Sequence, residues 1–72
     1  MTLVVNGKQV NCSDSLMVSE LLVKQNVKMP DMVSVELNGK ILKRSDFETT
    51  ALNEGDKVEF LYFMGGGVVI DY

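Results

Sequence analysis

Apolar and polar residues alternate in two short runs at the start of the chain, on either side of Asn6 and Gly7. Asn-Gly between alternating runs is the strongest short-range indication of a β-hairpin, because its turn needs two residues that tolerate a positive φ. We therefore expect a hairpin over residues 2–12 with one face toward the core. Alternation places on that face Leu3, Val5, Val10 and Cys12.

A helical period follows the hairpin. Its apolar residues recur at spacings of three and four, which forms one stripe along a helix: Val18, Leu21, Leu22 and Val27. Met17 stands where a Ser or Thr would be the better N-cap, so we expect Asp14 or Ser15 to cap this helix. The helix must end before Pro30, because the residue preceding a proline resists helical geometry.

The second half of the chain predicts another hairpin and a last strand. Asn38 and Gly39 separate two short runs over residues 33–43, and one helical turn with Phe47 as an apolar plug follows. After a turn at residues 54–56 comes a strand with two faces. Alternation puts Val58, Phe60 and Tyr62 on the core face and Glu59, Leu61 and Phe63 on the other.

These elements predict one small α+β domain. The chain has 72 residues, which is the length of a single domain. The order of strands and helices fits a β-grasp, in which a mixed sheet of four to five strands packs on one helix. Gly65, Gly66 and Gly67 are the main compositional break, so we expect a domain over residues 1–67 and a tail over residues 68–72. Glycine resists continuing a strand, so the tail should be decoupled from the sheet.

The residue types exclude most catalysis by the chain alone. There is no His, which removes the usual nucleophile pairs and the commonest transition-metal ligand, and we expect no metal site. The single Cys12 excludes an internal disulfide and is expected to be a buried, inert thiol. Asp14, Glu54 and Asp56 fit loops and turns better than a shared acidic cleft. We therefore expect no enzyme activity of its own and no bound cofactor.

The charge of the chain limits its partners. A net charge of −3 makes nucleic acid a poor partner, because affinity for phosphates comes from Lys and Arg. Lys40, Lys43 and Arg44 form a small basic group that fits a solvated loop. The apolar runs are too short for a membrane span, and no targeting segment appears at the start. These features predict a cytoplasmic protein with a basic protein surface as its partner.

The glycines after the last strand have two explanations. They are either an unstructured end or an arm that threads a narrow channel, because a chain without Cβ atoms can approach another active site closely. In the second case Gly65 and Gly66 form the arm. A docking patch beside it would contain outward-facing apolar residues, which we expect to be Val4, Leu61 and Phe63.

Five segments together resemble one protein family. They are "VNGK", "VSELL", "VSVELNGKIL", "EGDKVEFL" and "FMGGG", and their order and spacing carry the resemblance over residues 1–67. The chain resembles the thiamine-biosynthesis sulfur carrier proteins, the ThiS family of ubiquitin-like β-grasp proteins.

The resemblance implies a carrier that other proteins act on. An adenylating, E1-like enzyme would use ATP to activate the carboxylate of Gly67. Sulfur from a cysteine desulfurase relay would then replace AMP, and a thiazole synthase would take the sulfur from the resulting thiocarboxylate. Gly66 and Gly67 are the matching positions, and Gly67 would carry the reactive carboxylate.

The chain departs from the family pattern after Gly67, because it continues "VVIDY". In this form the carboxyl group of Gly67 is part of a peptide bond, so the carrier reading requires a protease that trims the tail. Two alternatives remain open. One is the same chemistry for molybdopterin or amino-acid synthesis, and the other is a β-grasp interaction module that does no conjugation.

Overall fold

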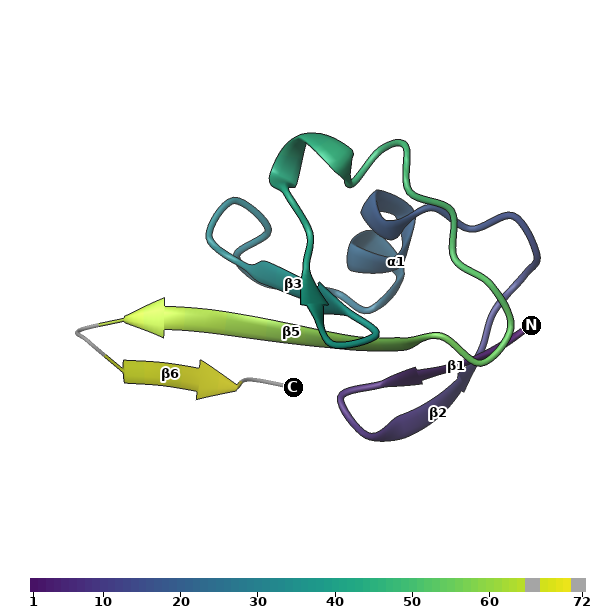
Figure 1. The fold of residues 1–72 in the computed structure, drawn as a ribbon, viewed down its shortest axis with the longest axis horizontal. Helices are drawn as coiled ribbons and strands as arrows, with labels where there is room; N and C mark the ends of the chain where they lie inside the picture. Colours follow the sequence, from purple (N-terminus) through teal and green to yellow (C-terminus); the bar gives the residue numbers. More distant parts are fainter. Residues whose placement is uncertain (65–66, 71–72) are drawn as a thin grey trace.

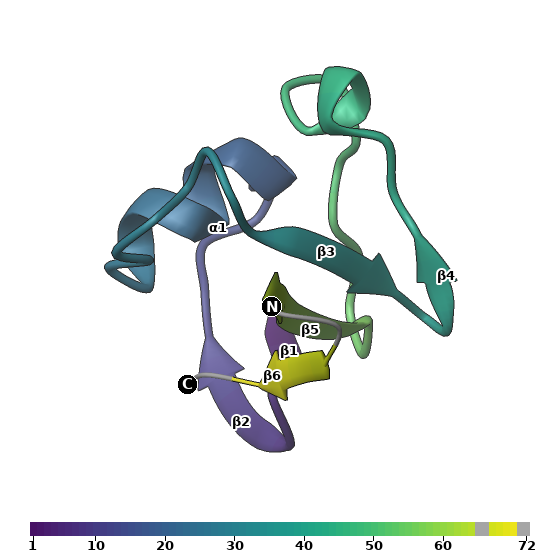
Figure 2. The ribbon, with the colours of Figure 1, turned by 90° about the vertical axis from the view of Figure 1, so that its left-hand side faces the viewer.

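The computed structural model describes residues 1–64 and 67–70. They form a mixed six-stranded sheet with one α-helix on one side of it, which confirms the α+β, β-grasp prediction (Figures 1 and 2). The elements are β1 (Thr2–Val5), β2 (Lys8–Asn11), α1 (Val18–Lys24), β3 (Ser34–Leu37), β4 (Lys40–Ile41), the 3-10 turn η1 (Arg44–Asp46), β5 (Lys57–Met64) and β6 (Gly67–Ile70).

The central strand of the sheet is β5. The strand order is β2-β1-β5-β3-β4, and β6 is a further neighbour of β5. Strands β1 and β5 run parallel, whereas β3 and β6 both run antiparallel to β5. A crossover through α1 and the second hairpin separates β1 from β5, as a parallel pair requires.

Both Asn-Gly turns form as predicted, and both attach to β5. Asn6 and Asn38 have positive φ values of 49° and 51°. The Asn38 Oδ1 accepts the Lys57 backbone N–H at 2.9 Å, and the Asn6 Oδ1 accepts the Phe60 backbone N–H at 2.9 Å. Each Asn therefore closes a hairpin and also occupies a backbone donor of the central strand.

The start of α1 differs from the prediction, because neither Asp14 nor Ser15 caps it. The N-cap is Met17, whose backbone N–H donates to the Glu20 Oε1 at 2.8 Å. The first helical amides are instead satisfied by backbone carbonyls, since Val18 donates to the Thr50 oxygen at 3.0 Å and Ser19 to the Phe47 oxygen at 2.9 Å. A distant loop thus replaces the side-chain cap that a helix start ordinarily needs.

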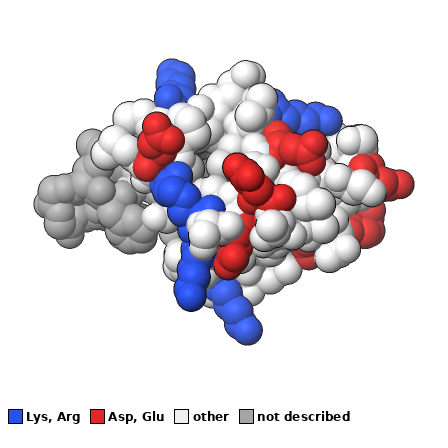
Figure 3. Space-filling model, turned by 90° about the horizontal axis from the view of Figure 1, so that it is seen from above, with Lys and Arg blue, Asp and Glu red and all other residues white. Residues whose placement is uncertain are grey.

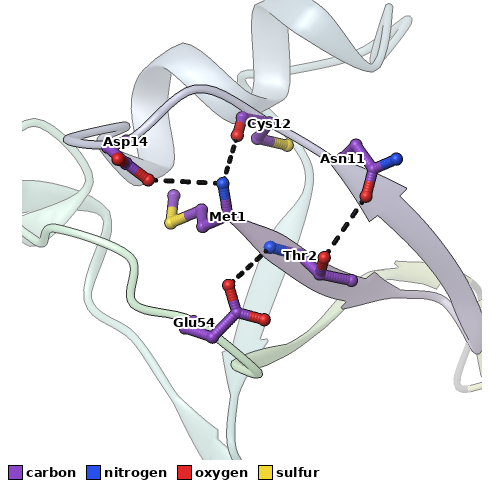
Figure 4. A network of polar contacts seen from close by, with 6 residues as sticks. All are labelled: Met1, Thr2, Asn11, Cys12, Asp14 and Glu54. Carbon is purple, nitrogen blue, oxygen red and sulfur yellow. Dashed lines mark hydrogen bonds and ion pairs between the residues drawn. The ribbon is translucent and has the colours of Figure 1, made fainter.

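Asp14 takes part in a different contact at the N-terminus (Figure 4). The Met1 ammonium lies 3.3 Å from the exposed Asp14 carboxylate and donates to the Cys12 carbonyl oxygen at 2.6 Å. The next backbone N–H, that of Thr2, donates to the Glu54 Oε1 at 2.9 Å. These contacts hold the start of β1 between the end of β2 and the turn that precedes β5.

The core lies between the sheet and α1, and the predicted core faces are confirmed. Three residues of the predicted stripe, Val18, Leu21 and Leu22, are buried in α1, whereas the fourth, Val27, is buried beyond the end of the helix at Lys24. Phe47, the predicted plug beside η1, is also buried. Cys12 is also buried, as expected. The most deeply buried side chains come from the strands, the helix and the loop before β3: Leu3, Val18, Leu21, Val33, Val35, Val58 and Phe60.

The expectation of a decoupled tail is wrong for residues 68–70, which continue the strand that begins at Gly67. Residues 67–70 form β6, whose register with β5 pairs Met64 with Gly67 and Leu61 with Ile70. Only two residues separate the strands, and Figure 1 shows β6 folding back along β5 at the end of the molecule away from the N-terminus. Gly65, Gly66, Asp71 and Tyr72 lie outside the described residues.

Leu61 is not the exposed residue that the alternation predicted. It lies on the face of β5 opposite the core cluster, as expected, but only 8% of it is exposed. Its cross-strand neighbours are Ser34 of β3 and Ile70 of β6. Strands on both sides of this position account for the burial, and the strand on one side belongs to the supposed tail.

We predict that Asn6→Gly lowers the free energy of unfolding by about 1–3 kcal/mol, because it removes the side-chain oxygen that accepts the part-buried Phe60 N–H. Glycine keeps the positive φ, so the turn itself is preserved. Urea unfolding measures the change. The matched control is Asn38→Gly, which should cost less than about 1 kcal/mol because water can reach the exposed Lys57 N–H. Equal decreases in the free energy of unfolding for the two variants would show that burial of the Phe60 N–H does not determine the cost.

We also predict that Leu61→Ala lowers the free energy of unfolding of the full chain by about 2 kcal/mol, which is the low end of the range for a buried leucine. In a chain that ends at Gly67 the same change should cost less than about 1 kcal/mol, because the side chain has then lost the strand beside it. Urea unfolding of the four chains gives this coupling as a double-mutant cycle.

Val58→Ala is the control for this cycle. Val58 is fully buried on the core face of the same strand, so its loss should be the same in both chain lengths. An unchanged cost of Leu61→Ala on shortening would show that β6 does not cover this position.

Candidate functional site

The candidate site is the end of the central strand, where β5 leaves the domain and β6 returns. Gly67, the residue that the resemblance marks as reactive, is the first residue of β6 and lies opposite Met64. The predicted arm residues Gly65 and Gly66 join the two strands and lie outside the described residues. A Gly67 paired within a sheet is a different arrangement from the free arm that the sequence suggested.

One edge of β5 is divided between two strands. Near its start, β5 pairs with β1, with Val5 opposite Val58. From Leu61 to Met64 it pairs with β6. Asn6 lies at the boundary, because its backbone N–H donates to the Val58 oxygen at 2.9 Å and its side chain accepts the Phe60 N–H. The Asn6 Nδ2 is buried without a hydrogen-bond partner among the described residues.

The three predicted docking residues do not form one described patch. Val4 is half-buried and lies opposite Lys57, which is four residues before Leu61 on β5. Four residues of strand correspond to roughly 13 Å, so Val4 is well separated from Leu61. Leu61 is buried in the full chain, and the side chain of Phe63 lies outside what the structure describes. Their role in docking stays a prediction.

The outer face of the sheet carries an acidic pair beside these positions. Glu36 of β3 lies directly opposite Glu59 of β5, where like charges disfavour each other. Glu59 is exposed and Glu36 is half-buried. This pair makes the outer face of the sheet locally acidic, in line with the negative net charge of the chain. A partner that binds this face is therefore expected to present a basic group.

On another face charges of both signs mix. Figure 3 shows Lys and Arg side chains beside Asp and Glu side chains across the face that carries α1 and the loops above the sheet. Arg44, from the predicted basic group, binds the chain itself: it donates to the Pro30 oxygen at 2.6 Å and the Val33 oxygen at 2.8 Å. Its guanidinium carbon also lies 5.5 Å from the centre of the Phe47 ring. Lys40 and Lys43 are exposed.

The carboxylates singled out in the sequence have structural contacts. The two Asp56 oxygens accept from the Asn53 backbone N–H at 2.8 Å and from the Asn38 side chain at 3.0 Å. Glu54 holds Thr2, as described above. Within the described residues no group of three or more His, Cys, Asp or Glu could hold a metal ion. No helix in the described part of the chain is long and apolar enough to cross a membrane.

A shallow apolar hollow lies elsewhere on the described surface. It has a volume of about 340 Å³ and lies between α1 and η1, with Leu22, Val27, Pro30 and Phe47 among its apolar lining. It is distant in the fold from the β5–β6 hairpin, and Arg44 at its wall is already bound to backbone carbonyls. The hollow therefore adds no reactive group to the site.

Sequence reasoning missed β6, although the chain carries a pattern for it. Gly-Gly between two β-forming runs is one of the two-residue links typical of a hairpin. The runs here are "FLYFM" and "GVVI", and the second is rich in β-branched residues. Taking the glycines only as a break hid this possibility.

Comparison with known proteins gives the family. The model of the ThiS family matches residues 3–67, which is nearly the whole chain and ends at Gly67. A crystal structure of a thiamine biosynthesis protein (ThiS) from Geobacter metallireducens is 51% identical, with a TM-score of 0.86, and the match covers 93% of this chain and 100% of that one. A solution structure of a thiamine biosynthesis protein from the same organism is 49% identical over 100% of this chain and 95% of its own, with a TM-score of 0.75.

Two curated relatives have other names. A thiazole synthase of Paramagnetospirillum magneticum is 42% identical over 67 residues; these are 93% of this chain but 20% of that protein, so the chain spans about a fifth of its length. A protein of Porphyra purpurea called ycf40 is 33% identical over 88% of this chain and 87% of its own length. With a family match that begins in β1, runs through β5 and ends at Gly67, this chain belongs to the ThiS family.

Proposed function

We propose that the chain is a sulfur carrier protein of thiamine biosynthesis, and that Gly67 carries the sulfur. The observation that supports this most directly is where the family match ends: it stops at Gly67, three residues past Met64, the last residue of the central strand. The relatives named thiamine biosynthesis protein and thiazole synthase support the pathway. The relative named thiazole synthase also makes such an enzyme the preferred acceptor of the sulfur.

The chemistry takes place on partner enzymes. An adenylating enzyme joins the Gly67 carboxylate to the α-phosphate of ATP, and pyrophosphate leaves. The acyl-adenylate has a good leaving group, so the terminal sulfur of a persulfide on a cysteine desulfurase relay can displace AMP and form an acyl disulfide. A thiol of the partner then cleaves the S–S bond, which leaves the thiocarboxylate on Gly67 and a disulfide on the partner. The resulting thiocarboxylate is a tethered sulfur nucleophile at high effective concentration in the synthase site. The chain itself contributes no catalytic group, and ATP is used by the partner.

The glycines fit this role for a steric reason. The reacting carbonyl must reach the α-phosphate in a channel that excludes water, and residues without Cβ atoms need the least room. The strand that leads to the arm is anchored in the sheet, because β5 is held on one edge by β3 as far as Leu61 and on the other by β1 as far as Val58. An anchored strand followed by a narrow glycine segment can bring the Gly67 carboxylate to a defined position in the partner's active site.

The carrier role requires the tail to be removed. In the chain of 72 residues, the Gly67 carbonyl carbon is bonded to the Val68 nitrogen, so no carboxylate is present at that position. A trimming protease would hydrolyse this bond and release Val68–Tyr72. Because the subsequent steps consume ATP and use a desulfurase, we place the protein in the cytoplasm.

We predict that Gly67→Ala in a chain ending at residue 67 lowers the rate of adenylation about 100-fold, because a displacement of about 1 Å at the reacting atom is enough for such a loss. ATP–pyrophosphate exchange with the adenylating partner measures this rate. The full chain should show no exchange above background.

Ser45→Ala in the same shortened chain is the control, since Ser45 is exposed in η1 and should exchange at the unchanged rate. Wild-type exchange by the Gly67→Ala chain would contradict the threading argument. Exchange by the full chain would mean that Tyr72 presents the carboxylate and that the chain is not a carrier of this kind.

A further inference from the structure

The peptide bond that trimming would cut lies inside a paired strand. Gly67 and Val68 are the first two residues of β6, opposite Met64 and Phe63 of β5. The pairing continues to Ile70, opposite Leu61. The bond is therefore held at the edge of the sheet on both sides of the cut.

The hydrogen-bonding direction of β6 follows from its neighbour. The Phe60 N–H points to the edge of β5 that Asn6 occupies, and successive residues of a strand alternate between edges. Tyr62 and Met64 therefore face the same edge as Phe60, which is the edge that β6 takes. Their register partners, Val69 and Gly67, must direct their backbone amides toward β5. Val68 and Ile70 direct theirs away from it.

We infer that β6 is an internal blocking strand that gates the release of Gly67. While β6 is paired, the Gly67–Val68 bond cannot lie in the binding cleft of a protease, and Gly67 cannot enter the channel of an adenylating enzyme. Opening of the hairpin exposes the bond. Hydrolysis then adds the hydroxyl of water to the Gly67 carbonyl carbon and a proton to the Val68 nitrogen, and the amide bond breaks. This inference rests on the proposed function, which makes Gly67 the reactive residue.

The size of β6 suits a gate. A strand of four residues at a sheet edge opens locally at a much lower free energy than the core unfolds. Burial of Leu61 next to β6 gives the closed state a contact that the open state loses. The closed state is therefore favoured, and the hairpin can open without disturbing β1, β3 or the helix.

Amide hydrogen exchange on the full chain tests the closed state. After correction for intrinsic rates, the Val69 amide should exchange at least about tenfold more slowly than the amides of Val68 and Ile70. This alternation distinguishes a paired strand from general shielding, which would slow all three. Equal exchange at the unstructured rate would overturn the inference.

A reversible crosslink tests the gate itself. Positions 61 and 70 are register partners that do not exchange backbone hydrogen bonds, and side chains in such pairs are close enough for a disulfide. Thermolysin cuts before large apolar residues such as Val68. It should remove the tail of oxidised Leu61→Cys/Ile70→Cys at least about tenfold more slowly than the tail of the reduced form, because opening of the hairpin limits the rate of cutting. Each aliquot is reduced before its intact mass is measured.

Ile70→Cys alone is the matched control, because it has the new thiol without a partner on β5 and should be cut at the same rate with and without oxidant. The buried Cys12 is present in both variants. Failure of the double variant to form the disulfide, or equal cutting of its two forms, overturns the inference.

The gate and the carrier role fail separately. Adenylation of a chain ending at Gly67 tests the carrier role with no β6 present. If that chain is adenylated but the β6 amides of the full chain exchange at the unstructured rate, the gate alone is overturned. A protected β6 with no adenylation of the shortened chain overturns the proposed function alone.

Discussion

A strand has only two edges, and in this protein three strands compete for those of β5. Strand β3 takes one edge from Leu61 back to Val58. The other edge is shared, with β1 at its start and β6 at its end. The sharing works because β1 turns away at Asn6, whose side chain takes the Phe60 N–H and so ends one ladder before the next begins. The hairpin, the core and the position of Gly67 all depend on this arrangement.

The position of Gly67 follows directly from this division. Since β1 leaves the edge of β5 after Val58, the last part of β5 extends past its neighbour with backbone groups available for pairing. An unpaired edge of this kind attracts other strands, and natural proteins cover such edges. In the full chain the cover is β6, which comes from the same chain. The segment that contains Gly67 therefore lies at an edge of the sheet, where a strand can leave without breaking the core.

Local patterns predicted the parts of the fold that local chemistry controls. The two Asn-Gly turns, the helix stripe and the alternation of β5 depend on residues close together in the sequence, and each was confirmed. The helix cap was wrong because its acceptors, Thr50 and Phe47, come from a loop some thirty residues away. No rule about residues 14–17 could have found them.

The burial of Leu61 shows the same limit within the candidate site. Alternation placed it correctly on the face opposite the core, but its exposure depends on which strands lie beside it. Gly67 was identified as the candidate reactive residue from the resemblance, whereas its pairing with Met64 could be found only from the sheet topology. Residue spacing predicts which face a side chain takes, and only the complete set of strand pairs determines whether water reaches that face.

The two halves of the segment after β5 have opposite conformational preferences, and this explains how one segment can be both a strand and an arm. Val68, Val69 and Ile70 are β-branched and favour a strand, whereas glycine loses more freedom than any other residue when it is ordered in one. The preference for pairing thus resides in the residues that the proposed trimming would remove. Once they are gone, Gly67 has little to hold it against β5. Extended backbone suits both the strand and a narrow channel, so the change from one to the other needs loss of pairing and no refolding of the domain.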